Sequence, residues 1–91
     1  MAISKAANGG SAVSVGTSDT VVLAANPSRT AVIFSNDHAT GVIYLALGKA
    51  ATLNSGIRLS PVGGTQILYG YTGSINGIST VAASGCCIAE I

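Results

Sequence analysis

The chain has 91 residues and a mass of 8.9 kDa, enough for one domain with one modest hydrophobic core. Only 8% of its residues are charged, against about 25% in a typical globular domain, and its net charge is +1. A free monomer with so few charges has little electrostatic protection against association, so we expect partners to cover much of its surface. The absence of a Lys/Arg cluster argues against a nucleic-acid-binding protein.

Neither end of the chain nor its longest uncharged stretch predicts a membrane or targeting segment. Residues 59–89 carry no charge, but Gly, Ser, Thr, Asn and Pro interrupt them too often for a membrane-spanning helix. Residues 1–10 contain a lysine with no apolar stretch after it, which is not typical of a signal peptide. We therefore expect the chain to be made and kept, or assembled, in a cytosol.

The two cysteines agree with that compartment. Cys86 and Cys87 are adjacent, and a bond between neighbours would depart far from ordinary disulfide geometry, so we expect free thiols. On a strand their side chains point to opposite faces. A metal site would need two further ligands, which His38 alone cannot supply. The sequence thus predicts no metal and no cofactor.

The distribution of residue types predicts β structure throughout. Val and Ile together number 17 against 6 Leu, and Thr adds 8 more β-branched residues. No segment places apolar residues at helical spacing, and 12 glycines cut the chain into short runs. We predict an all-β fold, a small antiparallel β-sandwich that is jelly-roll-like, with about eight short strands and no significant helix. In chain order these strands lie near residues 13–15, 20–25, 29–35, 42–47, 56–59, 65–71, 74–80 and 86–91.

The chain divides into an arm and a domain. Residues 1–12 are too weakly apolar to fold alone, so we expect a flexible N-terminal arm, followed by a single sandwich domain over residues 13–91. Within the arm, Ile3 and Lys5 supply an apolar anchor and a charge suited to a partner's groove. We expect the arm to order on that partner.

Strands 29–35 and 42–47, joined by a polar loop over residues 36–41, are predicted to form a hairpin. Each strand is apolar on both faces. The residues of the second faces are Ala31 and Ile33 on the first strand and Val42, Tyr44 and Ala46 on the other. Because a solvated antiparallel sheet is usually apolar on one face only, we expect the second face to meet another protein or subunit. Under the alternative, its small residues merely tolerate water.

The sequence contains no recognisable combination of catalytic residues. His38 lies beside Asp37 in the predicted loop, and no Gly-x-Ser-x-Gly nucleophile turn occurs. The three acidic residues fall in different segments, and the glycine-rich stretches precede strands rather than helices, so neither a carboxylate pair nor a phosphate-binding loop is indicated. We expect the protein not to be an enzyme.

Four side chains stand out as candidates for specific contacts. Tyr69 and Tyr71 are two residues apart and hence predicted on one strand face, where they could anchor an interface, stack on a sugar or fill the core. Arg29 and Arg58 each open a strand in a neutral context and can pair with a carboxylate. For Arg29 an internal partner, Asp19 or Glu90, is the competing interpretation.

Four stretches carry a family resemblance: residues 26–36 (Asn-Pro-Ser-Arg-Thr-Ala-Val-Ile-Phe-Ser-Asn), 41–48, 56–64 and 70–73. Together they resemble small β-sandwich structural proteins of tailed bacteriophages, namely capsid decoration (cement) proteins and related head-fibre or tail-associated domains. The resemblance covers roughly residues 20–80. It implies a non-enzymatic virion component, often a homotrimer, bound outside the lattice of the major capsid protein. The lack of a fibre domain after the sandwich favours cement over fibre.

We therefore expect a capsid decoration protein that stabilises the shell, located on the capsid surface of a virion and assembled in the host cytoplasm. Its partners would be the major capsid protein and further copies of itself, with no nucleic acid and no membrane. The expected interface residues are Ile3, Lys5, Arg29, Arg58, Tyr69 and Tyr71. The alternative is a carbohydrate- or receptor-binding module of a phage head or tail fibre, with Tyr69 and Tyr71 as its site.

Overall fold

The computed structural model describes residues 10–91, which form eight strands in two four-stranded sheets. The strands are β1 (Ser11–Val15), β2 (Thr20–Leu23), β3 (Ala31–Asn36), β4 (Ile43–Leu47), β5 (Ile57–Leu59), β6 (Gly64–Tyr69), β7 (Ile75–Ser79) and β8 (Ser84–Glu90). Within this part of the chain there is no helix that could cross a membrane. The predicted all-β fold of about eight short strands is confirmed.

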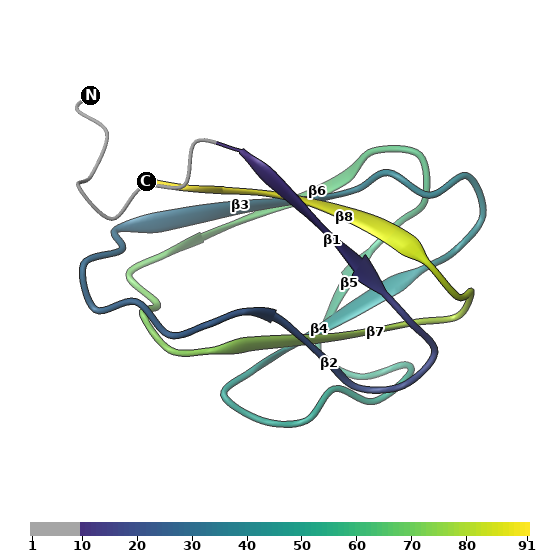
Figure 1. Cartoon of the computed structure of the whole chain (residues 1–91), viewed down its shortest axis with the longest axis horizontal. Coiled ribbons are helices and arrows are strands. Elements are labelled where there is room, and N and C mark those ends of the chain that lie inside the picture. Colours follow the sequence, from purple (N-terminus) through teal and green to yellow (C-terminus); the bar gives the residue numbers. More distant parts are fainter. Residues whose placement is uncertain (1–9) are drawn as a thin grey trace.

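The two sheets have related strand orders. Sheet A runs β1-β8-β3-β6 and sheet B runs β2-β7-β4-β5, with every neighbouring pair antiparallel. The pairs β1–β8, β2–β7, β3–β6 and β4–β5 join the first half of the chain to the second half in reverse order. A double-stranded ribbon rolled up in this way is the jelly-roll arrangement. Figure 1 views it along the sheets, with sheet A above sheet B.

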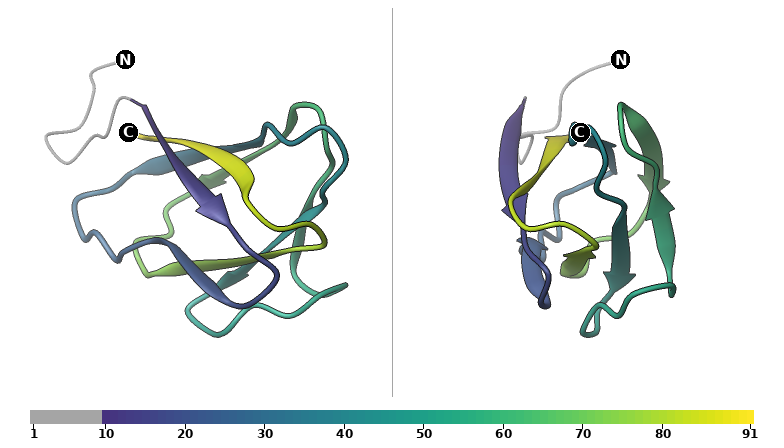
Figure 2. Two further views of the ribbon diagram at one scale, coloured as in Figure 1. Left: turned by 45° about the vertical axis from the view of Figure 1, so that its right-hand side comes forward. Right: turned by 90° about the vertical axis from the view of Figure 1, so that its right-hand side faces the viewer.

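Strand alternation builds one core between the sheets. Every second residue of a strand points inward, and seven of the ten residues in the buried cluster between the sheets are β-branched or aromatic. The buried cluster consists of Val15, Val22, Val32, Phe34, Ile43, Leu45, Leu59, Ile75, Cys86 and Ile88. Strands β1 and β2 lie at one side of this core and β6 at the opposite side, as the right-hand view of Figure 2 shows.

The predicted hairpin between strands β3 and β4 is wrong. β3 pairs with β6 and β8 in sheet A, whereas β4 pairs with β5 and β7 in sheet B. The connection over residues 37–42 therefore crosses from one sheet to the other. Asn36 holds this crossing, because its buried side-chain amide donates to the carbonyls of Gly41 (2.7 Å) and Leu59 (3.0 Å). A polar loop of this length suits a crossover as well as a hairpin.

The strand boundaries shift at two places that matter for the surface. β1 begins at Ser11, two residues before the predicted start, and pairs with β8 over its full length. The first nine residues, and with them Ile3, Lys5 and most of the predicted arm, lie outside the described residues. β6 ends at Tyr69 rather than at Tyr71, because Gly70 adopts a left-handed conformation with φ of 75°.

Candidate interaction surface

The charged residues are distributed unevenly between the two sheets. Among residues 10–91, Arg29 and Glu90 are buried against each other, and the exposed charges are Asp19, Asp37, Lys49 and Arg58. Asp37 directly follows β3, and the other three belong to β5 or to loops of the sheet B side. No strand of sheet A carries an exposed charge within the described chain. One broad side of the sandwich therefore lacks charge.

We define the outer face of sheet A by the side chains that point away from the core. Core residues Val32, Phe34 and Ile88 fix the inward positions, and the register then assigns the remaining ones to the outside. These outward residues are Ala12, Ser14, Ala31, Ile33, Ser35, Thr65, Ile67, Tyr69, Gly85, Cys87 and Ala89. All are uncharged.

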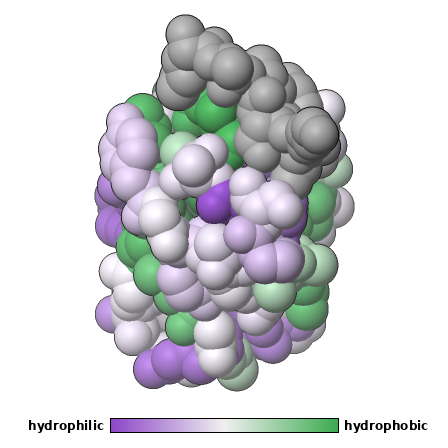
Figure 3. Space-filling view, turned by 90° about the vertical axis from the view of Figure 1, so that its left-hand side faces the viewer, coloured by the Kyte–Doolittle hydropathy of each residue, from purple (hydrophilic) through white to green (hydrophobic). Residues whose placement is uncertain are grey.

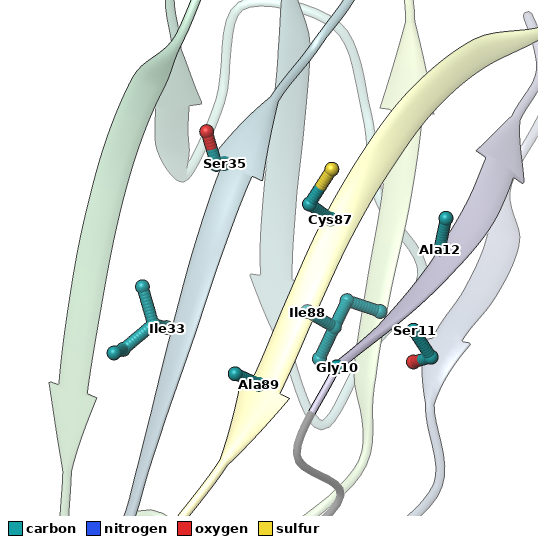
Figure 4. Close-up of a pocket in the computed structure, with 8 residues that line it drawn as sticks. All are labelled: Gly10, Ser11, Ala12, Ile33, Ser35, Cys87, Ile88 and Ala89. Carbon is teal, nitrogen blue, oxygen red and sulfur yellow. The ribbon is translucent and has the colours of Figure 1, made fainter.

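The exposed large apolar side chains of this face lie on β6 at one side, and mostly small side chains lie on the other strands. On β6, Tyr69 is 78% exposed and Ile67 is 39% exposed. Figure 3, which looks at one end of the sandwich, shows hydrophobic patches on its upper, sheet A side and further patches lower down. Over β1, β8 and β3 the small side chains leave an open, shallow groove of about 550 Å³, in which Ala12, Ile33, Cys87 and Ala89 face the solvent (Figure 4). A flat partner could lie across the whole face without meeting a charge.

The outer face of sheet B is different, because the protein covers its central part, over β4 and β7, with its own chain. The loop over residues 48–56 places Ala51 against Tyr44, Ala46 and Ile78, and all four are buried. Asp19 holds the loop by accepting a hydrogen bond from the Ala51 amide at 2.7 Å. The expectation that the second face of β4 meets another protein is therefore wrong. A loop with few apolar residues gave no sign in the sequence that it would fold back in this way.

Arg29 lies inside the protein rather than on the surface. Its side chain is buried, and its Nε donates to Glu90 Oε2 at 2.9 Å. Its remaining nitrogens donate to the carbonyls of Ala24, Tyr71 and Gly73. Of the two interpretations of Arg29, internal pairing with Glu90 is the one that the structure contains. Its guanidinium nitrogens are occupied within the chain, and we leave it out of the candidate surface.

The structure separates the other candidate side chains. Tyr69 and Tyr71 do not share a strand face, and that prediction is wrong. The left-handed turn at Gly70 points Tyr71 toward the core, where its hydroxyl donates to the Ser74 carbonyl at 2.9 Å, while Tyr69 stays exposed on sheet A. Arg58 is exposed on β5, opposite Tyr44 on sheet B, and donates to Ser60 Oγ. Only Tyr69 of these residues belongs to the outer face of sheet A.

Polar side chains at the crossover between the sheets serve the backbone. His38 Nδ1 accepts hydrogen bonds from the amides of Thr40 (3.0 Å) and Gly41 (2.7 Å), so the second nitrogen carries the proton when the ring is neutral. Ser84 Oγ contacts Ser79 Oγ at 2.7 Å and donates to the Val81 carbonyl. Within residues 10–91 no three His, Cys, Asp or Glu residues lie close enough to hold a metal ion.

The two cysteines have opposite environments, as predicted for neighbours on a strand. Cys86 is fully buried in the core and Cys87 is exposed in the groove on sheet A; both are free. Burial raises the pKa of the Cys86 thiol to about 11, and the neighbouring Cys87 adds to that shift. Cys86 is thus a protonated core residue at neutral pH, whereas Cys87 is part of the candidate surface.

Sequence reasoning found part of this surface, since it placed Ala31 and Ile33 on an apolar face that was expected to meet another protein, but it missed Ile67, Cys87 and Ala89. Their role depends on which strands are neighbours, and that information comes only from the sheet order. One signal was present, since residues 59–89 contain no charge and include both β6 and most of β8.

Comparisons with known proteins identify no relative. No protein-family model, no curated protein and no solved structure matches the chain. The function must therefore be argued from the fold and from this surface.

Proposed function

We propose that the protein is a non-enzymatic virion structural protein, a capsid decoration (cement) protein that binds the outer surface of the major capsid protein lattice and stabilises the shell. The observation that carries the proposal is the uncharged outer face of sheet A, which spans four strands. The resemblance of residues 20–80 to structural proteins of tailed bacteriophages supplies the partner and the expectation of three copies at each site.

The physical argument rests on desolvation. Moving a charge from water into an interface is costly unless it finds a partner, and the outer face of sheet A has none to move. Its apolar groups, among them Ile33, Ile67 and Tyr69, gain free energy when a partner covers them. A protein that stays attached to a particle after assembly benefits from such a face. The low overall charge of the chain fits this permanent coverage.

The size of the face favours contact with more than one neighbour. Four strands of about six residues span roughly 20 by 20 Å, or about 400 Å². A stable interface buries about 800 Å² on each partner, so this face alone supplies about half of that area. A lattice of capsid subunits offers adjacent chains, and a decoration protein that bridges two of them adds the missing area from its loops.

The alternative, a carbohydrate- or receptor-binding module, receives less support. Jelly rolls occur in both viral capsid proteins and lectins, so the fold alone does not separate the two functions. The proposed sugar platform required Tyr69 and Tyr71 on one face, and Tyr71 instead packs toward the core. We therefore favour decoration over sugar binding.

The test uses purified particles of the phage that encodes the chain. Electron cryomicroscopy should place the sandwich on the outside of the shell, with the outer face of sheet A against capsid subunits. Particles from which the chain has been deleted should release their contents at a lower temperature, and adding the chain back should restore the release temperature. Density on the tail or a fibre would favour the alternative, and absence of the chain from purified particles would refute both.

A pair of variants then tests the face itself. Cys87→Glu places a charge in the centre of the outer face of sheet A, at an exposed position that a charge can occupy without disturbing the core. It should abolish reattachment to the deleted particles. Thr52→Glu, in the exposed loop on the sheet B side, is the matched control and should reattach like the wild-type chain. Equal reattachment of both variants would argue against this face as the capsid contact.

A further inference from the structure

Strand β6 forms an unprotected edge of sheet A. Proteins usually guard edge strands by keeping them short, by charges, by proline or by bulges, because unpaired backbone groups attract other strands. In the described chain, β5 is three residues long and carries Arg58, and β2 is four residues long with an irregular register. β6 has six residues, no charge, no proline and an unbroken register with β3. It is the longest of the four edge strands that the structure describes.

The register shows which backbone groups of β6 face away from the sheet. The Gly70 amide donates to the Thr30 carbonyl at 2.8 Å, which extends the β3–β6 pairing by one residue. The backbone groups of successive residues in an antiparallel strand point alternately to one side and to the other. The backbone amides and carbonyls of Leu68 and Gln66 therefore face β3 as well. The amides and carbonyls of Thr65, Ile67 and Tyr69 therefore point outward. Among the described residues only the Gln66 side chain covers any of these groups, through an exposed hydrogen bond of 3.1 Å to the Ile67 carbonyl.

We propose that the β6 edge pairs with β6 of a second copy of this chain, in antiparallel orientation about a two-fold axis. The outward backbone groups fix the register of this pairing. Ile67 lies opposite Ile67 of the second copy, and Thr65 of each copy lies opposite Tyr69 of the other. The result is a continuous eight-stranded sheet that joins the two outer faces of sheet A. This inference does not depend on the proposed function.

The side chains favour a second copy as the occupant of this edge. The contact pairs Ile with Ile and Thr with Tyr, and cross-strand pairs of β-branched and aromatic residues are stabilising. Like charges would repel across a two-fold axis, but β6 contains no charge that could do so. The contact is also closed, since each copy uses its β6 edge once and the pairing does not extend into a fibre.

The area predicts a weak dimer. A strand of six residues is about 20 Å long and a sheet is about 10 Å thick, so pairing along this edge covers about 200 Å² on each copy, or about 400 Å² in total. That total lies below the range of tight complexes, so we expect a dissociation constant of about 10 to 500 μM. When an assembly holds two copies close together, their effective concentration reaches the range of this dissociation constant, and the dimer forms. A three-fold trimer cannot use this symmetric contact internally, so the experiment also separates the two arrangements.

The first experiment uses the wild-type chain at low and high concentration. Sedimentation should show a monomer at about 1 μM and a dimer near 1 mM, the limits set by the expected affinity. Amide hydrogen exchange followed by NMR should slow with concentration at Ile67 and Tyr69, while Gln66 and Leu68 are protected at both concentrations because they bond to β3. A monomer at 1 mM, a trimer, or a dimer whose Ile67 and Tyr69 amides stay unprotected would overturn the proposal.

The second experiment tests the register by charge exchange. Ile67→Lys and Ile67→Glu each place like charges directly opposite one another and should weaken self-association about tenfold or more. Mixing the two variants should produce a one-to-one heterodimer, because the introduced charges then attract. Val62→Lys, at a 78% exposed loop position outside the edge, is the control and should dimerise like the wild type. Failure of the mixture to form heterodimers, with both variants folded by circular dichroism, would exclude this register.

Discussion

Arg29 and Glu90 form a buried ion pair that closes the jelly roll, with 2.9 Å between Arg29 Nε and Glu90 Oε2. Glu90 is the last residue of β8, and Arg29 lies in the connection before β3. The same guanidinium donates to the carbonyls of Ala24, Tyr71 and Gly73, and Glu90 also accepts from Asn26 Nδ2. One arginine therefore fastens the β2–β3 and β6–β7 connections to the final strand.

The first prediction concerns this pair. Glu90→Leu should lower the free energy of unfolding by about 3 to 5 kcal/mol, because it leaves the Arg29 charge buried without a counter-charge. Arg29→Met should also destabilise, since three carbonyls lose their donor. The double change should cost less than the two single changes added together, as expected for a directly coupled pair. Urea unfolding measures all three variants, and strictly additive losses would show that the pair is not coupled.

The second prediction concerns Asn36, which is fully buried between the sheets. Its amide donates to the Gly41 and Leu59 carbonyls, and its Oδ1 accepts from the His38 amide. Asn36→Asp replaces the donating group with an oxygen that faces two carbonyls, and we expect a loss of about 2 to 4 kcal/mol. Asn76→Asp changes a partly exposed amide that bonds to Asp19, and should cost about 1 kcal/mol or less. Equal losses in thermal melts would contradict the bridging role of Asn36.

The sequence predicted the number of strands well, because each strand is bounded by residues with a local preference for turns. Pro27 lies in the connection between β2 and β3, and Gly63, with φ of 91°, lies in the turn between β5 and β6. Local preference does not say which strands become neighbours. Residues 36–41 are as polar as a hairpin loop, yet they cross between sheets, since the inward faces of β3 and β4 fill the same core from opposite sides.

The candidate surface was less predictable for the same reason. Ile67 and Cys87 are twenty residues apart, and they share a face only because β3 lies between β6 and β8. The burial of Arg29 was not predictable either, because an arginine at the start of a strand gives no sign in the sequence of a buried partner. Its ion pair with Glu90 joins residues 61 positions apart.

The third prediction separates the two tyrosines. Tyr69→Ala should change the free energy of unfolding of the monomer by less than about 0.5 kcal/mol, because its side chain is 78% exposed. Tyr71→Ala should cost about 2 to 4 kcal/mol, since it removes a ring packed on the core and the hydrogen bond to the Ser74 carbonyl. In the proposed dimer and in capsid attachment the order reverses, with Tyr69 the more important residue. A larger stability loss for Tyr69→Ala than for Tyr71→Ala in urea unfolding would contradict this assignment.

The last prediction follows from the raised pKa of Cys86, which is about 11 in the folded protein against 9.0 for an unperturbed thiol. Below pH 9 the thiol is protonated in both states, and its contribution to stability is complete. Between pH 9 and pH 11 the unfolded chain releases the proton while the folded chain keeps it, so the free energy of unfolding falls by roughly 2 to 3 kcal/mol.

Cys86→Ala should remove this part of the pH dependence, although it lowers stability overall by leaving a cavity. Cys87→Ala, at the exposed neighbour, should keep it. Urea unfolding of the three proteins at pH 8, 9, 10 and 11 measures the slopes, and an unchanged slope in Cys86→Ala would mean that Cys86 does not cause the alkaline loss.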